Sequence, residues 1–213
     1  MARSNRELSS DFPLHVYARS NNRDRFPIPL EEVWSILEDY LFLLKVGFSI
    51  EIISVVLMPN HFHLIVRDPK MNLPAAMKFF MRETSKEINR RSGRINHMWG
   101  GPFESSVIKS LDYYYTCYRY VYRNPVAAGL TDSVLNYHFS SLAILLGQRS
   151  SMISLAEDLT LFSSLESTIA WLEDESADKH RDQIKKSLKY AVMEFVAERK
   201  SRKPFRLPPH HFH

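Results

Sequence analysis

Two histidines separated by one residue, His61 and His63, have the types and spacing of metal ligands. They follow an apolar, β-branched stretch at residues 50–57 and a Pro59-Asn60 turn, so they should open a new strand. Alternate side chains of a strand share a face, so both imidazoles should point the same way. Such a pair suits a divalent cation that finds at least one further ligand, although two histidines of a half-buried strand could also simply face solvent.

A second pair of polar residues lies near the end of a tyrosine-rich helix, which we predict at residues 111–123. We expect this helix to stop before Pro125, because proline disfavours the helical conformation in the residue before it. Tyr120 and Asn124 are one helical turn apart and therefore share a face. The amide oxygen of Asn124 could ligate a hard cation, and the phenol of Tyr120 would then reach a phosphate polarised by that cation. Asn124 could equally be a cap that ends the helix.

Most tyrosines of this helix are explained better by packing in the core, with their hydroxyls reaching the surface. These residues are Tyr114, Tyr115, Tyr118 and Tyr122. Tyr113 lies two turns before Tyr120 on nearly the same face, so it is the second candidate for a nucleophile.

Strands and helices alternate along the part of the chain that must position these residues. Their order predicts an α+β fold, with an antiparallel four- to five-stranded sheet and helices packed on its faces. We assign residues 10–148 to one catalytic domain and residues 149–213 to a helical C-terminal extension with a basic tail. The predicted strands are residues 12–19, 49–57, 61–67 and 103–110, and the predicted helices are residues 30–46, 72–91 and 111–123.

The composition of the chain excludes several classes of protein. With 213 residues, 45% of them apolar and 24% charged, the chain is globular and not disordered along most of its length. A single cysteine excludes a disulfide framework and favours a reducing compartment. The first residues lack the apolar core of a secretory signal, and no stretch is apolar enough to span a membrane, so we expect a cytoplasmic protein with no membrane partner.

Basic side chains are the candidates for contacts with nucleic acid, and the formal net charge of +4 is compatible with such a partner. Several lie on the helix at residues 72–91, where interspersed glutamates also allow the simpler interpretation of a solvated helix face. The C-terminal tail has the same two interpretations, as a phosphate-binding arm or a solubilising end. The candidates are Arg19, Lys78, Arg82, Arg90, Arg91, Arg94, Arg202 and Lys203.

The two motifs together closely resemble those of a known family. The run Met-Pro-Asn-His-Phe-His-Leu-Ile-Val, followed by Tyr120-Val-Tyr-Arg-Asn124-Pro-Val-Ala-Ala-Gly-Leu, is similar to the single-tyrosine transposases of the HUH superfamily, especially the REP-associated tyrosine transposases of the IS200-like family. The resemblance implies that His61, His63 and Asn124 bind Mg²⁺ or Mn²⁺ and that Tyr120 is the nucleophile. One departure is Gly100, at a position after tryptophan where relatives more often carry glutamine.

The resemblance also implies an activity and a partner. The chain would be a metal-dependent transesterase that cleaves and rejoins single-stranded DNA near hairpins or palindromes through a 5′-phosphotyrosine intermediate. It would bind single-stranded or hairpin DNA and act as a monomer or a homodimer. Two alternatives are a non-catalytic descendant that only binds DNA hairpins, and a metal-dependent hydrolase in which water is the nucleophile and Tyr120 is dispensable.

Overall fold

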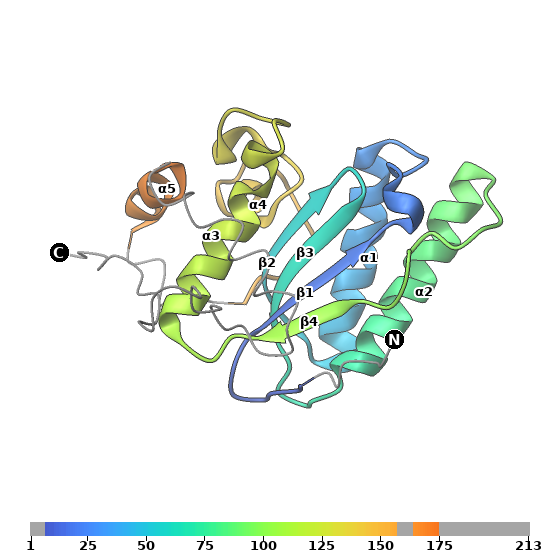
Figure 1. Ribbon diagram of the computed structural model, residues 1–213, viewed down its shortest axis with the longest axis horizontal. Coiled ribbons are helices and arrows are strands. Elements are labelled where there is room, and N and C mark those ends of the chain that lie inside the picture. The colour runs from blue at the N-terminus through green and yellow to red at the C-terminus, as the bar shows by residue number, and fades with distance from the viewer. Residues whose placement is uncertain (1–6, 157–163, 175–213) are drawn as a thin grey trace, which may run out of the picture.

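The computed structural model describes residues 7–156 and 164–174, and four strands form one sheet at its centre (Figure 1). The sheet has the order β2-β3-β1-β4, and every neighbouring pair is antiparallel. The elements are β1 (Leu14–Arg19), α1 (Leu30–Phe48), β2 (Glu51–Met58), β3 (His61–Arg67), α2 (Leu73–Ser92), β4 (Glu104–Val107), α3 (Leu111–Ala127), α4 (Ser141–Leu145) and α5 (Leu165–Glu173), with short 3-10 turns η1 (Asn21–Arg23) and η2 (Val134–Asn136).

Each face of the sheet is covered by different helices, because the strands alternate their side chains between two cores. Helices α1 and α2 pack together behind the sheet in Figure 1, whereas α3 and α4 lie on the other face. In β3, Phe62 and Leu64 join the core beneath α1 and α2, while Ile65 joins the core beneath α3. His61 and His63 therefore face the side of the sheet that α3 occupies.

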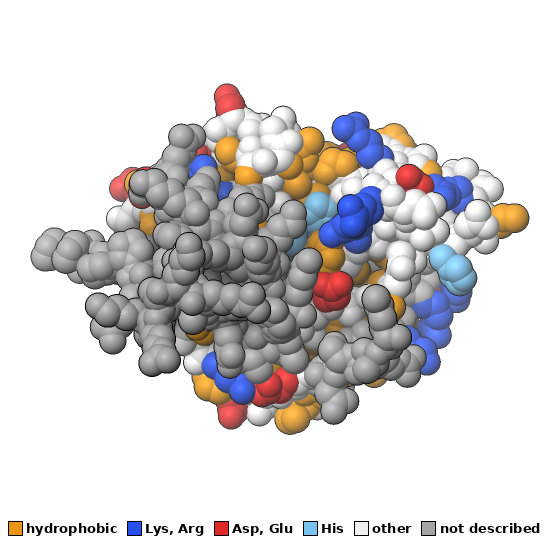
Figure 2. All heavy atoms as spheres, viewed as in Figure 1, with side chains coloured by type: hydrophobic (Ala, Val, Ile, Leu, Met, Phe, Trp, Pro, Cys, Tyr) orange, Lys and Arg blue, Asp and Glu red, His pale blue; other side chains and the backbone are white. Residues whose placement is uncertain are grey.

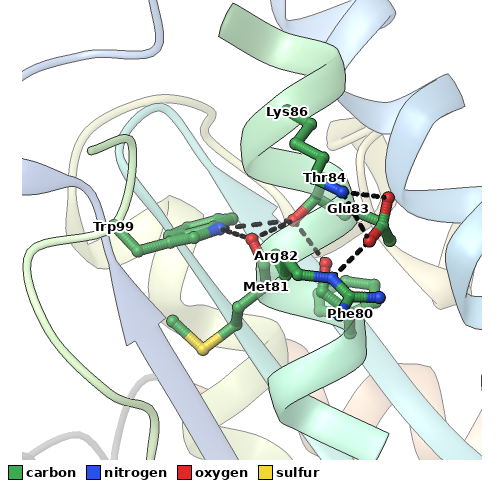
Figure 3. A network of polar contacts seen from close by, with 7 residues as sticks. All are labelled: Phe80, Met81, Arg82, Glu83, Thr84, Lys86 and Trp99. Carbon is green, nitrogen blue, oxygen red and sulfur yellow. Dashed lines mark hydrogen bonds and ion pairs between the residues drawn. The ribbon is translucent and has the colours of Figure 1, made fainter. Parts of the chain in front are cut away.

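Trp99 anchors the segment after α2 to the back of the sheet. Its indole Nε1 donates to the carbonyl oxygen of Met81, at 3.0 Å, and to Oγ1 of Thr84, at 3.2 Å (Figure 3). Its ring meets Phe62 edge-on, with the two ring centroids 5.3 Å apart. Because Phe62 lies between the two histidines in the sequence, this packing supports the strand that carries them.

The predicted α+β fold and antiparallel sheet are confirmed, with four strands among the described residues. Most predicted boundaries lie within two residues of the observed ones, and two differ by more. Helix α3 does not stop before Pro125 but continues to Ala127, because a proline in the last turn removes only one backbone hydrogen bond and the amide of Ala128 still bonds to the carbonyl of Asn124, at 3.0 Å. Strand β4 is shorter than residues 103–110, since its partner β1 begins only at Leu14.

Within the predicted C-terminal extension the structure describes residues 149–156 and 164–174, which include helix α5, and the predicted division after residue 148 stays a prediction. Segment 151–156 returns to the sheet, where the amide of Ala156 bonds to the carbonyl of Ile52. Arg202 and Lys203 lie outside the described residues. Within the described ranges, no helix combines the length and the hydropathy that a bilayer span requires.

Candidate active site

Strand β3 presents the two predicted metal ligands at its first and third positions. The rings of His61 and His63 have centroids 5.1 Å apart and are nearly perpendicular, at 84°. His61 Nδ1 lies 2.6 Å from Oδ1 of Asn60, and the amide nitrogen of Asn60 donates in turn to the carbonyl of Arg23, at 2.7 Å. The side chain of His63 is buried, so the pair leads from the surface toward the interior.

Helix α3 brings Tyr120 and Asn124 to these histidines. Nδ2 of Asn124 lies 2.8 Å from Nε2 of His63, and both side chains are buried. The ring of Tyr120 meets His63 edge-on, with centroids 5.6 Å apart. Because the helix continues past Pro125, Asn124 is held within the helix and is not the cap that ends it. Tyr113, the second candidate nucleophile, lies in the first turn of α3, where its amide bonds to Ser110 Oγ.

His15, on strand β1, belongs to the same cluster. It lies outside both sequence motifs, which therefore do not identify it. Its Nε2 lies 2.9 Å from Nδ1 of His63, and the two rings stack with centroids 5.1 Å apart. The same ring meets Tyr120 edge-on at 6.5 Å. Burial lowers the pKa of His15 to about 3, so the ring is neutral at physiological pH. The feature of the sequence that points to His15 is strand alternation, which places it on the same face of β1 as Tyr17 and Arg19.

Tyr17 and Arg19 form the outer side of the cluster. Tyr17 is paired across strands with His63, and Arg19 with His61. The Tyr17 ring lies 5.0 Å from His63 and 5.4 Å from His61, measured between centroids. Nε of Arg19 donates to the Tyr17 hydroxyl, and its guanidinium carbon lies 5.3 Å from the Tyr17 ring centroid. Arg19, a predicted DNA contact, thus lies directly beside the histidines.

The donor set fits a divalent cation of the Mn²⁺ or Mg²⁺ type. Among the described residues, no group of three or more histidine, cysteine, aspartate or glutamate side chains converges on one point. A cation at His61 and His63 would therefore take a further protein ligand from a neutral side chain, and Asn124 is already within hydrogen-bond distance of His63. Rotation of the Asn124 amide would place its oxygen where its nitrogen now lies.

The basic residues of α2 lie on the opposite face of the sheet from this cluster. Lys and Arg side chains gather along the edge that α2 forms, on the right of Figure 2. Most of them are paired with glutamates of the same helix, as the interpretation of a solvated face requires. The ion pairs of these arginines are Arg82 with Glu83, Arg90 with Glu87 at 2.6 Å, and Arg91 with Glu87 at 2.9 Å and with Glu32 at 3.5 Å.

Comparison with known proteins places this arrangement in a family. Residues 10–124, more than half of the chain, match the family described as "Transposase IS200 like". The chain belongs to this family of transposases. The matched residues run from before β1 to Asn124 and so contain the histidine strand and Tyr120, whereas helix α5 lies outside them. No curated protein sequence matched the chain.

Two solved structures are similar to this transposase. One is described as "Structure of the REP associates tyrosine transposase bound to a REP hairpin", with 22% sequence identity and a TM-score of 0.58, covering 76% of this chain and 96% of that chain. The other is a proposed transposase from Deinococcus radiodurans, with 15% identity and a TM-score of 0.40, covering 57% of this chain and 95% of that chain. The first likeness shows that the two proteins share a fold.

Proposed function

We propose that the chain is a metal-dependent transposase that cleaves and rejoins single-stranded DNA beside a hairpin, with Tyr120 as the nucleophile. One observation carries this proposal: Tyr120 and Asn124, from successive turns of α3, both reach His63, which lies beside His61. A candidate nucleophile and three candidate metal ligands thus meet on one face of the sheet. Membership in a transposase family supports the same chemistry.

The proposed reaction is a transesterification at phosphorus. The oxygen of Tyr120 forms a bond to the phosphorus atom, and the bond from phosphorus to the 3′ oxygen of the preceding nucleotide breaks. The phenol loses its proton, and the departing 3′ oxygen takes one up as a hydroxyl. The 5′ end stays esterified to Tyr120. Because one phosphate ester replaces another, a second 3′ hydroxyl can reverse the step and join a new strand without an energy-rich cofactor.

The residues around Tyr120 have separate tasks in this proposal. His61, His63 and Asn124 would hold Mg²⁺ or Mn²⁺, which supplies Lewis-acid polarisation of the phosphate when bound. Arg19 adds a fixed positive charge beside His61 for a phosphate oxygen, and its bond to Tyr17 orients the guanidinium. Lys78, Arg82, Arg90, Arg91 and Arg94 would contact the DNA backbone further from the reacting atoms.

Hairpin DNA is the proposed partner. The similar transposase of known structure is described as bound to a REP hairpin, and we extend that partner to this chain as part of the proposal. A hairpin with a single-stranded flank would present a phosphate of the unpaired strand to Tyr120, while the basic side chains contact the phosphates of the duplex.

The test is formation of a covalent adduct between protein and DNA. The full chain is incubated with a pool of 5′- and 3′-labelled hairpin oligonucleotides, with Mn²⁺, with Mg²⁺ or with EDTA, and the products are separated on denaturing gels. We expect a metal-dependent adduct that retains the label of the 3′ fragment, which carries the reacting 5′ phosphate. Tyr120→Phe should abolish it, and Tyr113→Phe should leave it intact.

Other outcomes would favour the alternatives. Hairpin binding without an adduct, in either metal and across the pool, would indicate the non-catalytic descendant. Cleavage that survives Tyr120→Phe but is lost in Tyr113→Phe would move the nucleophile to Tyr113. Cleavage that survives both substitutions and yields no adduct would indicate a hydrolase that activates water.

A further inference from the structure

His15 is a buried histidine of β1 that packs against the candidate active site. It is 2% exposed, and its ring contacts two residues of the proposed mechanism, His63 by stacking and Tyr120 edge-on. A buried imidazole needs partners for its polar atoms. The partner of its Nε2 is Nδ1 of His63, at 2.9 Å.

The hydrogen-bond partners determine which nitrogen of each ring carries the proton. In the orientation that the structure gives the Asn124 amide, Nδ2 donates, and Nε2 of His63 accepts with its lone pair. A neutral His63 then carries its proton on Nδ1 and donates it to His15. His15 accepts through Nε2 and therefore carries its own proton on Nδ1.

His61 has the same tautomer for an analogous reason. Oδ1 of Asn60 can only accept, so Nδ1 of His61 donates to it across 2.6 Å. The orientation of the Asn60 amide is fixed because its nitrogen donates to the carbonyl of Arg23. Both histidines consequently keep the lone pair on Nε2, which is the atom that a metal would bind.

We propose that His15 is a positioning residue: it accepts the Nδ1 proton of His63 and, together with Asn124, holds the tautomer and the ring orientation that present Nε2 of His63 to a divalent cation. This inference rests on the proposed function for its purpose, but its structural content concerns only His15, His63 and Asn124. His15 itself is proposed neither as a metal ligand nor as a DNA contact. A hydrogen-bond acceptor behind a metal-binding imidazole is worth about 10- to 100-fold in metal affinity.

Two substitutions distinguish the role of His15 as a hydrogen-bond acceptor from its role in packing. His15→Gln keeps an acceptor oxygen near the place of Nε2, whereas His15→Phe keeps a flat ring and removes the acceptor. His138→Gln, at an exposed histidine, is the matched control. Circular dichroism and thermal unfolding establish that each variant folds.

The first measurement is the tautomer of His63 in the metal-free full chain, read from long-range proton–nitrogen NMR correlations after selective ¹⁵N labelling of histidine. We expect a protonated Nδ1 in the wild type, in His15→Gln and in His138→Gln, and a mixture or a protonated Nε2 in His15→Phe. A protonated Nε2 of His63 in the wild type would overturn the inference, even if His15→Phe failed to fold.

The second measurement is the affinity of the same proteins for Mn²⁺ without DNA, by titration calorimetry. We expect Kd to rise about 10- to 100-fold in His15→Phe, to recover most of the way in His15→Gln and to stay unchanged in His138→Gln. An affinity of folded His15→Phe equal to that of the wild type would refute the positioning role. If the wild type bound no Mn²⁺, the proposed metal-dependent function would fail, while the NMR result would still decide the assignment of His15.

Discussion

Nη1 of Arg123 donates to the main-chain carbonyl of Leu172 across 2.9 Å, which joins the C-terminal end of α5 to the helix that carries Tyr120. Arg119, one turn earlier, donates to the carbonyl of Trp171. Two guanidinium groups thus meet the carbonyl end of α5, where the helix dipole favours positive charge. Since Tyr120 and Asn124 project from the same helix, α5 contributes to the position of the candidate site.

We predict that Arg123→Met destabilises the protein by about 1–3 kcal/mol, because a buried carbonyl loses a charged donor. Lys78→Met, on the exposed surface of α2, is the control and should change the free energy of unfolding by less than about 0.5 kcal/mol. Urea unfolding of both variants checks this. Equal stabilities of the two would mean that the contact between α3 and α5 contributes nothing measurable.

Arg19 should affect the chemical step more than the binding of metal. Arg19→Gln removes the charge beside His61, and we expect the rate of adduct formation to fall about 10- to 1,000-fold while Mn²⁺ affinity stays within a factor of two. Arg67→Gln, at the far end of β3, is the matched control. Single-turnover rates with saturating hairpin DNA provide the measurement, and a loss confined to DNA affinity would assign Arg19 to binding alone.

The ion pairs of α2 predict opposite effects for two charge changes. Glu87→Gln releases Arg90 and Arg91 from their shared carboxylate, so hairpin affinity should rise if this face contacts phosphates. Lys78, which has no ion pair among the described residues, should lose one phosphate contact in Lys78→Ala and reduce the slope of log K against log salt by about 0.9. Fluorescence anisotropy across a salt series measures both. Unchanged slopes and affinities would remove α2 from the DNA interface.

Cys117 gives the stability of the protein a defined dependence on high pH. Burial raises the pKa of its thiol, so the folded state keeps the proton where the unfolded chain releases it. The resulting stabilisation is present below the pKa of the unfolded thiol and is lost as pH rises above about 8.5–9. We expect the free energy of unfolding to decline more steeply between about pH 8 and pH 10 for the wild type than for Cys117→Ala. Parallel pH profiles would contradict this.

A side chain at Gly100 should destabilise the protein, whereas a side chain at Gly101 should not. A Cβ atom at Gly100 would lie 3.0 Å from the carbonyl oxygen of Ser20, and a Cβ at Gly101 would meet nothing within 4 Å. We therefore expect Gly100→Ala to cost about 1–3 kcal/mol and Gly101→Ala to cost less than about 0.5 kcal/mol. Thermal unfolding of the pair measures the difference, which should be larger still for Gly100→Gln. A stable Gly100→Gln would show that the loop after Trp99 can move.

The sequence predicts much of this structure because its local patterns agree with the packing. The alternation in β3 places His61 and His63 on one face of the strand. Helical spacing places Tyr120 and Asn124 on one face of α3, which can pack against that strand. The sequence does not determine which helix covers which face, so the separation of the α2 arginines from the histidines emerges only from the fold. His15 is missed for a similar reason, because its contact with His63 depends on the cross-strand register of β1 and β3.

Strand β3 contributes to the core on one face and to the candidate site on the other, which limits the changes in length that the chain can accept. Phe62 and Leu64 fill one core while His61 and His63 form the candidate site on the other face. A one-residue slip of β3, which a change in the length of the tight turn at Pro59-Asn60 would favour, would therefore exchange the two sets. Imidazoles would then enter the apolar layer, and a phenyl ring would replace a candidate metal ligand. A library of length variants should therefore recover functional chains with altered loops elsewhere, but with this turn always at its present length.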